Sequence, residues 1–354
     1  MNFKALIEKI SQQYENHLPF VVFSPSNNEN VKCFCQRNNV LHRDNGLTKN
    51  GFVLAPFDDR LESYLIPQNE SDSFITPFEI SEIEQKRVEI SENERSKMTY
   101  KKFINSTIET IQNENAKKIV VSRKKEFPLS KFSIAILIER LFSAYPTAFR
   151  YIWFHPETGI WCGATPETLV DIKENEFKTM ALAGTQPYAF GEITWRKKEL
   201  EEQLFVTEAI LDNLKDIVKD FEVSKVRSHR AGSLLHLCTH ISGKLEKGRG
   251  SLSKIAQALH PTPAVCGTPR NFARDFIIKN EGYPREFYTG FMGPIEDHGA
   301  SATLMVNLRC MKIENGKASV FVGGGITADS VPEEEWKETQ NKMQTMLQVL
   351  HPML

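Results

Sequence analysis

The sequence lacks several features that would restrict the location or the partners of the protein. Its 354 residues contain no run of about 18 apolar residues, so no transmembrane helix is predicted. The first ten residues resemble an amphipathic helix and lack the uninterrupted apolar region of a signal peptide. The formal net charge is only −1, which gives no electrostatic reason to expect nucleic acid or an anionic membrane as a partner. A soluble, cytoplasmic protein is expected.

Cysteine is also sparse and scattered. The chain has six cysteines, and Cys33 and Cys35 are two residues apart instead of forming a CxxC pair. This spacing argues against a zinc site and favours reduced thiols. The chain has no internal repeat, and its length allows one large core or two smaller ones.

The segment from residue 318 to residue 350 combines three informative features. Residues 318–322 read as a strand, and the three glycines Gly323 to Gly325 allow a close approach to the backbone. Ser330 and Glu333 have the spacing of a capping box, with Pro332 in the first turn of a helix. The buried side of that helix is predicted from its apolar spacing to contain Trp336, Met343, Leu347 and Leu350.

Two pairs of glutamates are spaced to lie on one face of a helix each. Glu335 and Glu338 belong to the helix just described, and Glu199 and Glu202 belong to a long helix predicted from about residue 195 to residue 221. If both pairs face one cavity, four carboxylates meet and a divalent cation is required, with Mg²⁺ fitting best. Otherwise both pairs are solvated surface charges. The long helix is predicted to bury Leu200, Leu204, Leu211, Leu214 and Val218.

Two further residues lie at the ends of predicted strands. Lys118 begins a β-branched run that ends at Arg123 and reads as a strand. Glu167 follows the turn at residues 163–166, where a glycine and a proline favour a tight connection. A glutamate in this place is either a general acid or an exposed turn residue.

Three more positions are candidate binding residues. Gly184 and Thr185 end a short strand and offer an N–H and a hydroxyl group to an anion. Arg309 ends a strand predicted over residues 302–309, where it either binds a carboxylate with two hydrogen bonds or is an ordinary edge residue. His236 and His240 are predicted to be packing or hydrogen-bonding residues and not metal ligands.

Together, and in this order, the motifs of the chain resemble those of the chorismate-utilising enzymes, which include isochorismate, salicylate, anthranilate and aminodeoxychorismate synthases. The resemblance covers about residues 97–350. It rests on nine segments, namely 118–123, 163–167, 182–185, the helix with Glu199 and Glu202, 259–267, 285–290, 306–309, 323–326 and 335–339.

The resemblance implies an α/β fold of two large, mostly antiparallel sheets packed as a sandwich and flanked by helices. Residues 1–95 would be a variable amino-terminal part and residues 96–354 the chorismate-binding catalytic region of one compact domain. It also implies one Mg²⁺, bound directly by Glu202 and Glu338 and through water by Glu199 and Glu335.

The resemblance is closest to the isochorismate synthases of menaquinone or siderophore pathways. Relatives that transfer ammonia usually have glutamine at the position of Lys118, or lysine at that of Ala183. These two residues therefore disfavour an aminating enzyme, and no glutaminase subunit is expected. Salicylate synthases share both residues and remain the alternative. The protein is expected to be a monomer or weak homodimer.

The residue roles that the resemblance implies describe an isomerase. Lys118 would take a proton from the water that adds at C2 of chorismate, and Glu167 would protonate the C4 hydroxyl as it leaves. The lysine pKa would have to be lowered and the glutamate pKa raised for these tasks. The substrate would be bound by Gly184, Thr185, His236, Tyr288, Arg309, Gly324, Gly325 and Lys342.

Overall fold

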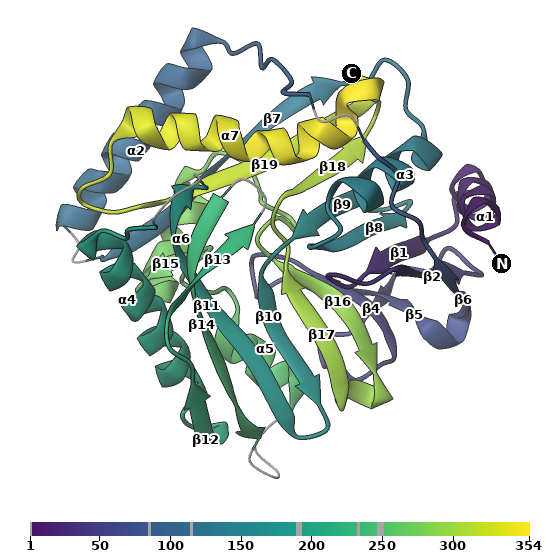
Figure 1. The fold of residues 1–354 in the computed structure, drawn as a ribbon, viewed down its shortest axis with the longest axis horizontal. Helices are drawn as coiled ribbons and strands as arrows, with labels where there is room; N and C mark the ends of the chain where they lie inside the picture. The colour runs from purple at the N-terminus through teal and green to yellow at the C-terminus, as the bar shows by residue number, and fades with distance from the viewer. Residues whose placement is uncertain (1, 84–85, 114–115, 189–192, 232–233, 246–250) are drawn as a thin grey trace.

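Two antiparallel sheets pack face to face in a computed structural model of the chain, and helices cover their outer faces (Figure 1). The structure describes residues 2–83, 86–113, 116–188, 193–231, 234–245 and 251–354. Neighbouring strands in this part of the chain pair antiparallel, for example β1 with β8 and β7 with β19. The predicted fold class, an α/β sandwich of two large sheets, is confirmed.

The first sheet contains nine strands among the described residues. Their order across the sheet is β15 (Gly267–Thr268), β7 (Lys118–Pro128), β19 (Lys317–Ile326), β18 (Cys310–Glu314), β9 (Gly159–Thr165), β8 (Phe149–His155), β1 (Phe20–Ser24), β2 (Asn30–Gln36) and β6 (Ser71–Pro77). The β7–β19 pair is long and brings the three glycines of β19 beside the start of β7.

The second sheet contains ten strands among the described residues, nine of them on one path. Their order is β12 (Val218–Val223), β14 (Leu234–Leu245), β11 (Glu176–Pro187), β10 (Thr168–Lys173), β17 (Ser301–Val306), β16 (Phe291–Glu296), β4 (Gly51–Ala55), β5 (Tyr64–Pro67) and β3 (His42–Arg43) for nine of them, with β13 (Arg227–Ala231) paired to β14 as the tenth. Strands from residues 20–77 are therefore built into both sheets. The division of the chain at residue 95 stays a prediction.

The space between the sheets is filled mainly by large aromatic side chains. Trp153 and Trp161 of the first sheet are fully buried there with Phe52 of the second sheet. The ring of Trp161 stacks on Phe321 with centroids 5.4 Å apart. Burial of such large apolar surfaces is the main force that holds the two sheets together.

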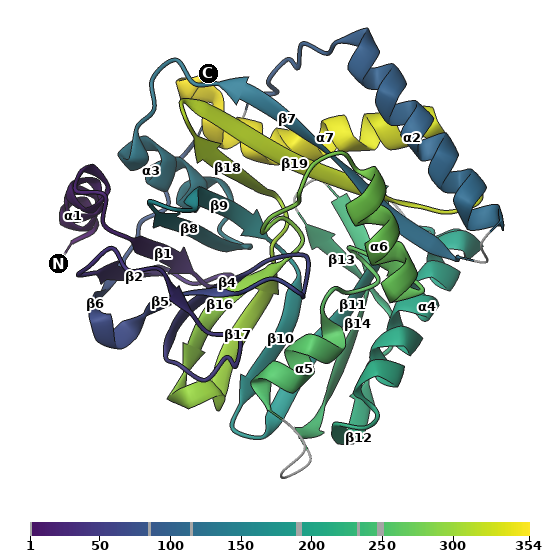
Figure 2. The same ribbon diagram turned by 180° about the vertical axis from the view of Figure 1, so that it is seen from behind.

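Seven α-helices of the described residues cover the sandwich. They are α1 (Phe3–Glu15), α2 (Glu94–Asn113), α3 (Ile134–Ala144), α4 (Lys197–Leu214), α5 (Leu252–Leu259), α6 (Arg270–Asn280) and α7 (Pro332–Leu350). Helices α1, α3 and α7 pack on the first sheet, and α4 and α5 pack on the second. Helices α2 and α6 both contact β7, on the side of the molecule shown in Figure 2. None of the helices in these ranges is long and apolar enough to cross a membrane.

Several local predictions are confirmed by these elements. The strand predicted at residues 118–123 is the first half of β7, and the turn at residues 163–167 connects β9 to β10. The apolar residues predicted for the last helix are buried in α7, including Trp336 and Met343. All six cysteines are buried, and each has a free thiol.

Three local predictions are wrong. The long helix ends at Leu214, and Val218 and Phe221 lie in β12. The strand predicted to reach Arg309 ends at Val306, and Arg309 has a φ of +47° in the turn before β18. This left-handed backbone turns the chain from the second sheet to the first.

The predicted capping box of α7 is also absent. Val331 occupies the N-cap position and makes no side-chain cap. The Ser330 hydroxyl instead accepts a hydrogen bond from the Thr327 N–H and donates one to Glu335. Glu333 is paired with Lys97 and Lys101 of α2. At the start of α7, Glu333 therefore forms ion pairs with α2 in place of the predicted capping-box contact with its own helix.

Candidate active site

A cavity that is open to solvent is lined by residues from both sheets and from two helices. Strands β7 and β19 contribute from the first sheet, β11 and β14 from the second, and α4 and α7 supply charged side chains (Figure 1). Most of the predicted site residues line this cavity. They are Lys118, Glu167, Gly184, Glu202, His236, Tyr288, Arg309, Gly324, Gly325, Glu338 and Lys342.

Two predicted site residues are placed differently, and a third is described by its backbone alone. Glu199 and Glu335 do not line the cavity, although each lies one helical turn from a glutamate that does. Thr185 lies in β11 opposite His236, but its side chain lies outside the described part of the structure.

Lys118 is buried at the first position of β7. Its Nζ donates a hydrogen bond to Oε1 of Glu202 at 2.6 Å. Gly325 of β19 leaves room for this lysine, because a Cβ at that position would lie 2.5 Å from Cε of Lys118. The glycines were predicted to allow a close approach to the backbone, and at Gly325 the group that approaches is the side chain of Lys118.

Gly324 makes room in the same way for a glutamate. A Cβ on Gly324 would lie 2.7 Å from Oε2 of Glu335. The other carboxylate oxygen of Glu335 accepts a hydrogen bond from Ser330 at 2.9 Å. This geometry places Glu335 behind the glycine backbone, at the edge of the cavity and not inside it.

Glu338 and Lys342 form a second lysine–glutamate pair in the cavity. Their Oε1 and Nζ atoms are 2.6 Å apart, and Lys342 also donates to the carbonyl of Gly323 at 2.7 Å. Burial alone would raise the pKa of Glu338, but Lys342 and Arg309 hold it below its usual value, so the group is ionised. The charge of Glu202 acts in the opposite direction, which shows that the two carboxylates are near each other.

Glu202 and Glu338 fit a Mg²⁺ ion whose remaining ligands are water and substrate oxygens. Glu202 and Glu338 face one cavity, and Mg²⁺ is commonly bound by one or two carboxylates together with water and substrate oxygens. Glu199 is bound by Arg196 with Nε–Oε1 at 3.0 Å. Across the described ranges, no three His, Cys, Asp or Glu side chains come close enough to form a metal site by themselves.

Glu167 is buried in the turn between β9 and β10. Its carbonyl accepts a hydrogen bond from the Val306 N–H at 2.9 Å. Burial raises the pKa of its carboxyl to about 7, and Lys118 and Thr262 oppose this rise. A carboxyl with this pKa can hold a proton near neutral pH and release it, as a general acid must.

Arg309, His236 and Tyr288 complete the polar lining. Burial, with Arg309 and Lys342 nearby, lowers the pKa of His236 to about 3, so its ring is neutral. Nδ1 of His236 lies 3.3 Å from the carbonyl of Gly184. Arg309 is partly buried and donates to Thr345 of α7 at 3.2 Å. The cavity therefore offers fixed positive charge from Arg309 and Lys342.

Sequence reasoning missed one wall of the cavity. Ala264 and Val265 line it. The three prolines of residues 261–269 indicated a rigid loop, but its small and apolar residues carried no signal of a chemical role.

The amino-acid sequence matches the family model described as "Chorismate binding enzyme" over residues 53–351. The chain belongs to the chorismate-binding enzymes. This confirms the resemblance on which the site residues were predicted.

The relatives of this chorismate-binding chain include several isochorismate synthases. DhbC of Bacillus subtilis strain 168 is 33% identical over 198 residues, which are 53% of this chain and 50% of the relative. EntC of Escherichia coli K12 is 30% identical over 243 residues, 66% of this chain and 62% of the relative. The matches thus span about half to three fifths of the length of these relatives.

Solved structures extend the similarity over nearly the whole fold. A putative 2,3-dihydroxybenzoate-specific isochorismate synthase, DhbC from Bacillus anthracis, superposes with a TM-score of 0.80 at 26% identity, covering 98% of this chain and 99% of the other. Anthranilate synthase component I from Streptococcus pneumoniae has a TM-score of 0.69 at 15% identity, covering 92% of each chain. The second similarity concerns the fold alone.

Proposed function

We propose that this chorismate-binding chain is an isochorismate synthase, a Mg²⁺-dependent isomerase that adds water at C2 of chorismate and removes the C4 hydroxyl. The observation that carries the proposal is the composition of the cavity. A lysine and a protonatable glutamate line the same cavity as two carboxylates and two fixed positive charges. The similarity to proteins named isochorismate synthase supports the same conclusion.

The chain's own residues divide the reaction into two proton transfers. Lys118 takes a proton from the attacking water, and Glu167 gives a proton to the departing C4 hydroxyl, which leaves as water. To act as this base, Lys118 must first leave Glu202 and lose a proton to solvent, because only the neutral amine has a lone pair that can accept one. Arg309 and Lys342 bind the enol-pyruvyl carboxylate.

Glu202 and Glu338 are the residues that would hold the cation. When bound, Mg²⁺ neutralises the ring carboxylate and draws electrons toward C1. In this structure the same two glutamates are paired with Lys118 and Lys342, so both lysines would have to move away from them for a cation to be held there.

Incubation of the purified protein with chorismate and Mg²⁺ tests the proposal. Isochorismate has the mass of chorismate and a different ultraviolet absorbance, so both are recorded. Conversion is expected with Mg²⁺ and is expected to stop after chelation. Loss of pyruvate would instead identify a salicylate synthase, and unchanged chorismate would refute both activities.

Lys118→Ala is expected to abolish turnover, because it removes the proposed base for the attacking water. The fold, measured by circular dichroism, should be retained. Lys124→Ala is the matched control, since Lys124 is an exposed lysine on the same strand, paired with Glu126. Normal turnover of Lys118→Ala would remove this residue from the mechanism.

A further inference from the structure

Helix α7 supplies two of the charged groups that line the cavity, Glu338 and Lys342. These residues are four apart and therefore lie on one face of the helix. The neighbouring face is buried and contains Trp336, Thr339 and Met343. Because Thr339 directly follows Glu338 in the same helix, the contacts that fix the buried face also fix the direction in which Glu338 points.

Arg123 of β7 contacts all three of these buried residues. Its Nε donates a hydrogen bond to Oγ1 of Thr339 at 2.9 Å. Its guanidinium carbon lies 3.9 Å from the centroid of the Trp336 ring, within the range of a cation–π interaction. Nη2 of Arg123 also lies 3.9 Å from Sδ of Met343. Arg123 does not line the cavity, and no step of the proposed reaction uses it.

Glu92 supplies the counter-charge that the Arg123 guanidinium needs. Oε1 of Glu92 lies 3.1 Å from Nη2 of Arg123, and neither side chain is more than 13% exposed. A buried arginine that lost this partner would keep an uncompensated charge. The other carboxylate oxygen of Glu92 accepts a hydrogen bond from Lys125 at 3.0 Å, so this glutamate is held by two residues of β7.

Glu92 ends a strap, residues 86–92, that is bound to α7 and forms neither a helix nor a strand. The N–H of Val88 donates to Oε1 of Gln344 at 3.0 Å, and the Val88 carbonyl accepts from Nε2 of the same glutamine at 2.9 Å. Gln348 donates to the carbonyl at the start of the strap at 2.6 Å. The strap therefore links α7 to β7, with Glu92 at the β7 end.

We propose that Arg123 and Glu92 are positioning residues that keep Glu338 directed into the cavity. Glu92 fixes the Arg123 guanidinium, and Arg123 fixes the buried face of α7 through Thr339. The inference rests on the proposed function, in which Glu338 is one of the two residues that would hold Mg²⁺. Groups that orient a metal ligand increase the affinity for the metal without touching it.

Glu92→Gln and Thr339→Val each remove one of these links and keep the size of the side chain. Both variants are expected to bind Mg²⁺ about ten-fold more weakly, measured by isothermal titration calorimetry without chorismate. With chorismate, the Mg²⁺ concentration that gives half the maximal rate should rise by the same factor, and kcat at saturating Mg²⁺ should stay near the wild-type value. Thr339→Ser keeps the hydroxyl group and should behave as the wild type.

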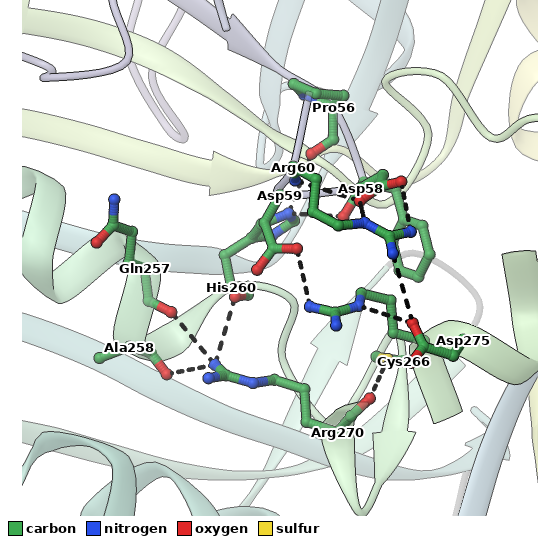
Figure 3. A network of polar contacts seen from close by, with 12 residues as sticks. Pro56, Asp58, Asp59, Arg60, Gln257, Ala258, His260, Cys266, Arg270 and Asp275 are labelled. Atoms are coloured by element: carbon green, nitrogen blue, oxygen red, sulfur yellow. Dashed lines mark hydrogen bonds and ion pairs between the residues drawn. The ribbon is translucent and has the colours of Figure 1, made fainter. Parts of the chain in front are cut away.

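Asp59→Asn is the matched control for Glu92→Gln. Asp59 accepts a hydrogen bond from Arg274 of α6 at 2.9 Å, within a polar network whose labelled residues all lie outside α7 (Figure 3). The control removes a carboxylate charge from an arginine in the same way, and it should leave the affinity for Mg²⁺ unchanged.

The outcomes separate positioning from a purely structural role. A folded Glu92→Gln or Thr339→Val variant that binds Mg²⁺ as tightly as the wild type overturns the inference, even if its free energy of unfolding is lower. An equal loss of affinity in Asp59→Asn also overturns it, because the effect would not depend on α7. A wild type that neither binds Mg²⁺ nor converts chorismate refutes the proposed function instead.

Discussion

Glu167 is destabilising for the fold at the pH where it is proposed to act. Burial raises the pKa of its carboxyl from 4.5 to about 7. Between these two values the folded protein holds a proton that the unfolded chain does not, so the free energy of unfolding falls as pH rises. Full ionisation of the Glu167 carboxyl lowers the free energy of unfolding by on the order of 3 kcal/mol, since one pKa unit corresponds to about 1.4 kcal/mol.

Glu167→Gln is therefore expected to stabilise the protein in a pH-dependent way. The amide has nearly the same shape and stays neutral, so the variant and the wild type should be similar at pH 4.5. At pH 8 the variant should be more stable by up to about 3 kcal/mol, because the amide avoids the cost of ionising the buried carboxyl. Urea unfolding at several pH values measures this difference. A difference that does not change with pH would show that the carboxyl is solvated.

At the scale of single residues, the sequence predicted which helices supply the glutamates of the site, but it did not predict which glutamate of each helix points into the cavity. The spacing of the glutamates suggested that two helices meet at one site, and Glu202 and Glu338 do line one cavity. The same spacing could not separate them from Glu199 and Glu335, because residues three apart share a helix face but differ in direction by about 60°. Which member of each pair points inward depends on the packing of the helix.

Helix α4 shows why apolar spacing failed at the scale of an element. Leu200 and Leu204 were predicted to be buried and are 44% and 54% exposed. Leu214 is buried as predicted, together with Val206 and Ile210. The first half of the buried face is polar instead, and Gln203 there donates to the carbonyl of Ala181 at 2.9 Å. A helix that must turn a glutamate into a cavity cannot also bury the leucines on its other side.

This corrected orientation gives a prediction for α4. Leu204→Gln should change the free energy of unfolding by less than about 0.5 kcal/mol, because the side chain is exposed. Ile210→Ala should cost about 2–4 kcal/mol, because Ile210 is 2% exposed in the core beneath the second sheet. Chemical denaturation of both variants measures the two values, and a large loss in Leu204→Gln would contradict this orientation of the helix.

A buried ion pair at the end of α6 joins three elements around the cavity. Arg285 contacts Glu281 through Nε–Oε2 at 2.7 Å and Nη2–Oε1 at 2.6 Å, and both side chains are nearly inaccessible. Arg285 also donates to the carbonyls of Val120 in β7 and Val265 in the proline-rich loop. The sequence contained Arg285 in a family motif, but nothing in its spacing identified Glu281 as the partner.

Removal of one charge from this pair should be strongly destabilising. Glu281→Gln leaves the buried guanidinium without a counter-charge, and we expect a loss of about 3–5 kcal/mol in the free energy of unfolding. The control is Glu62→Gln, because the pair of Arg43 and Glu62 is more than half exposed and should contribute less than about 1 kcal/mol. Equal losses for the two variants would contradict the structural role of Glu281.

At the scale of the whole molecule, the amino-terminal segment was the part that the sequence described least. Its residues 20–24 form β1, and no feature of the sequence identified the strands that pair with it. In the structure β1 lies between β8 and β2. Pairing between strands more than a hundred residues apart depends on the tertiary fold, and a single sequence without repeats contains no direct signal of it.

Deletion of residues 2–49 is therefore expected to prevent folding, even though the family match begins at residue 53. The deletion removes α1, β1, β2 and β3, exposes the edge of β8, and strips Leu6, Ile10 and Phe20 from the core of the first sheet. The matched control is a chain cleaved within residues 45–49 that keeps both fragments, since it has the same break but loses no strand. Solubility and thermal unfolding distinguish the two, with the cleaved protein folded and the truncated one aggregated. A truncated chain that unfolds cooperatively near the wild-type temperature would show that residues 2–49 are an accessory to the sandwich and not part of it.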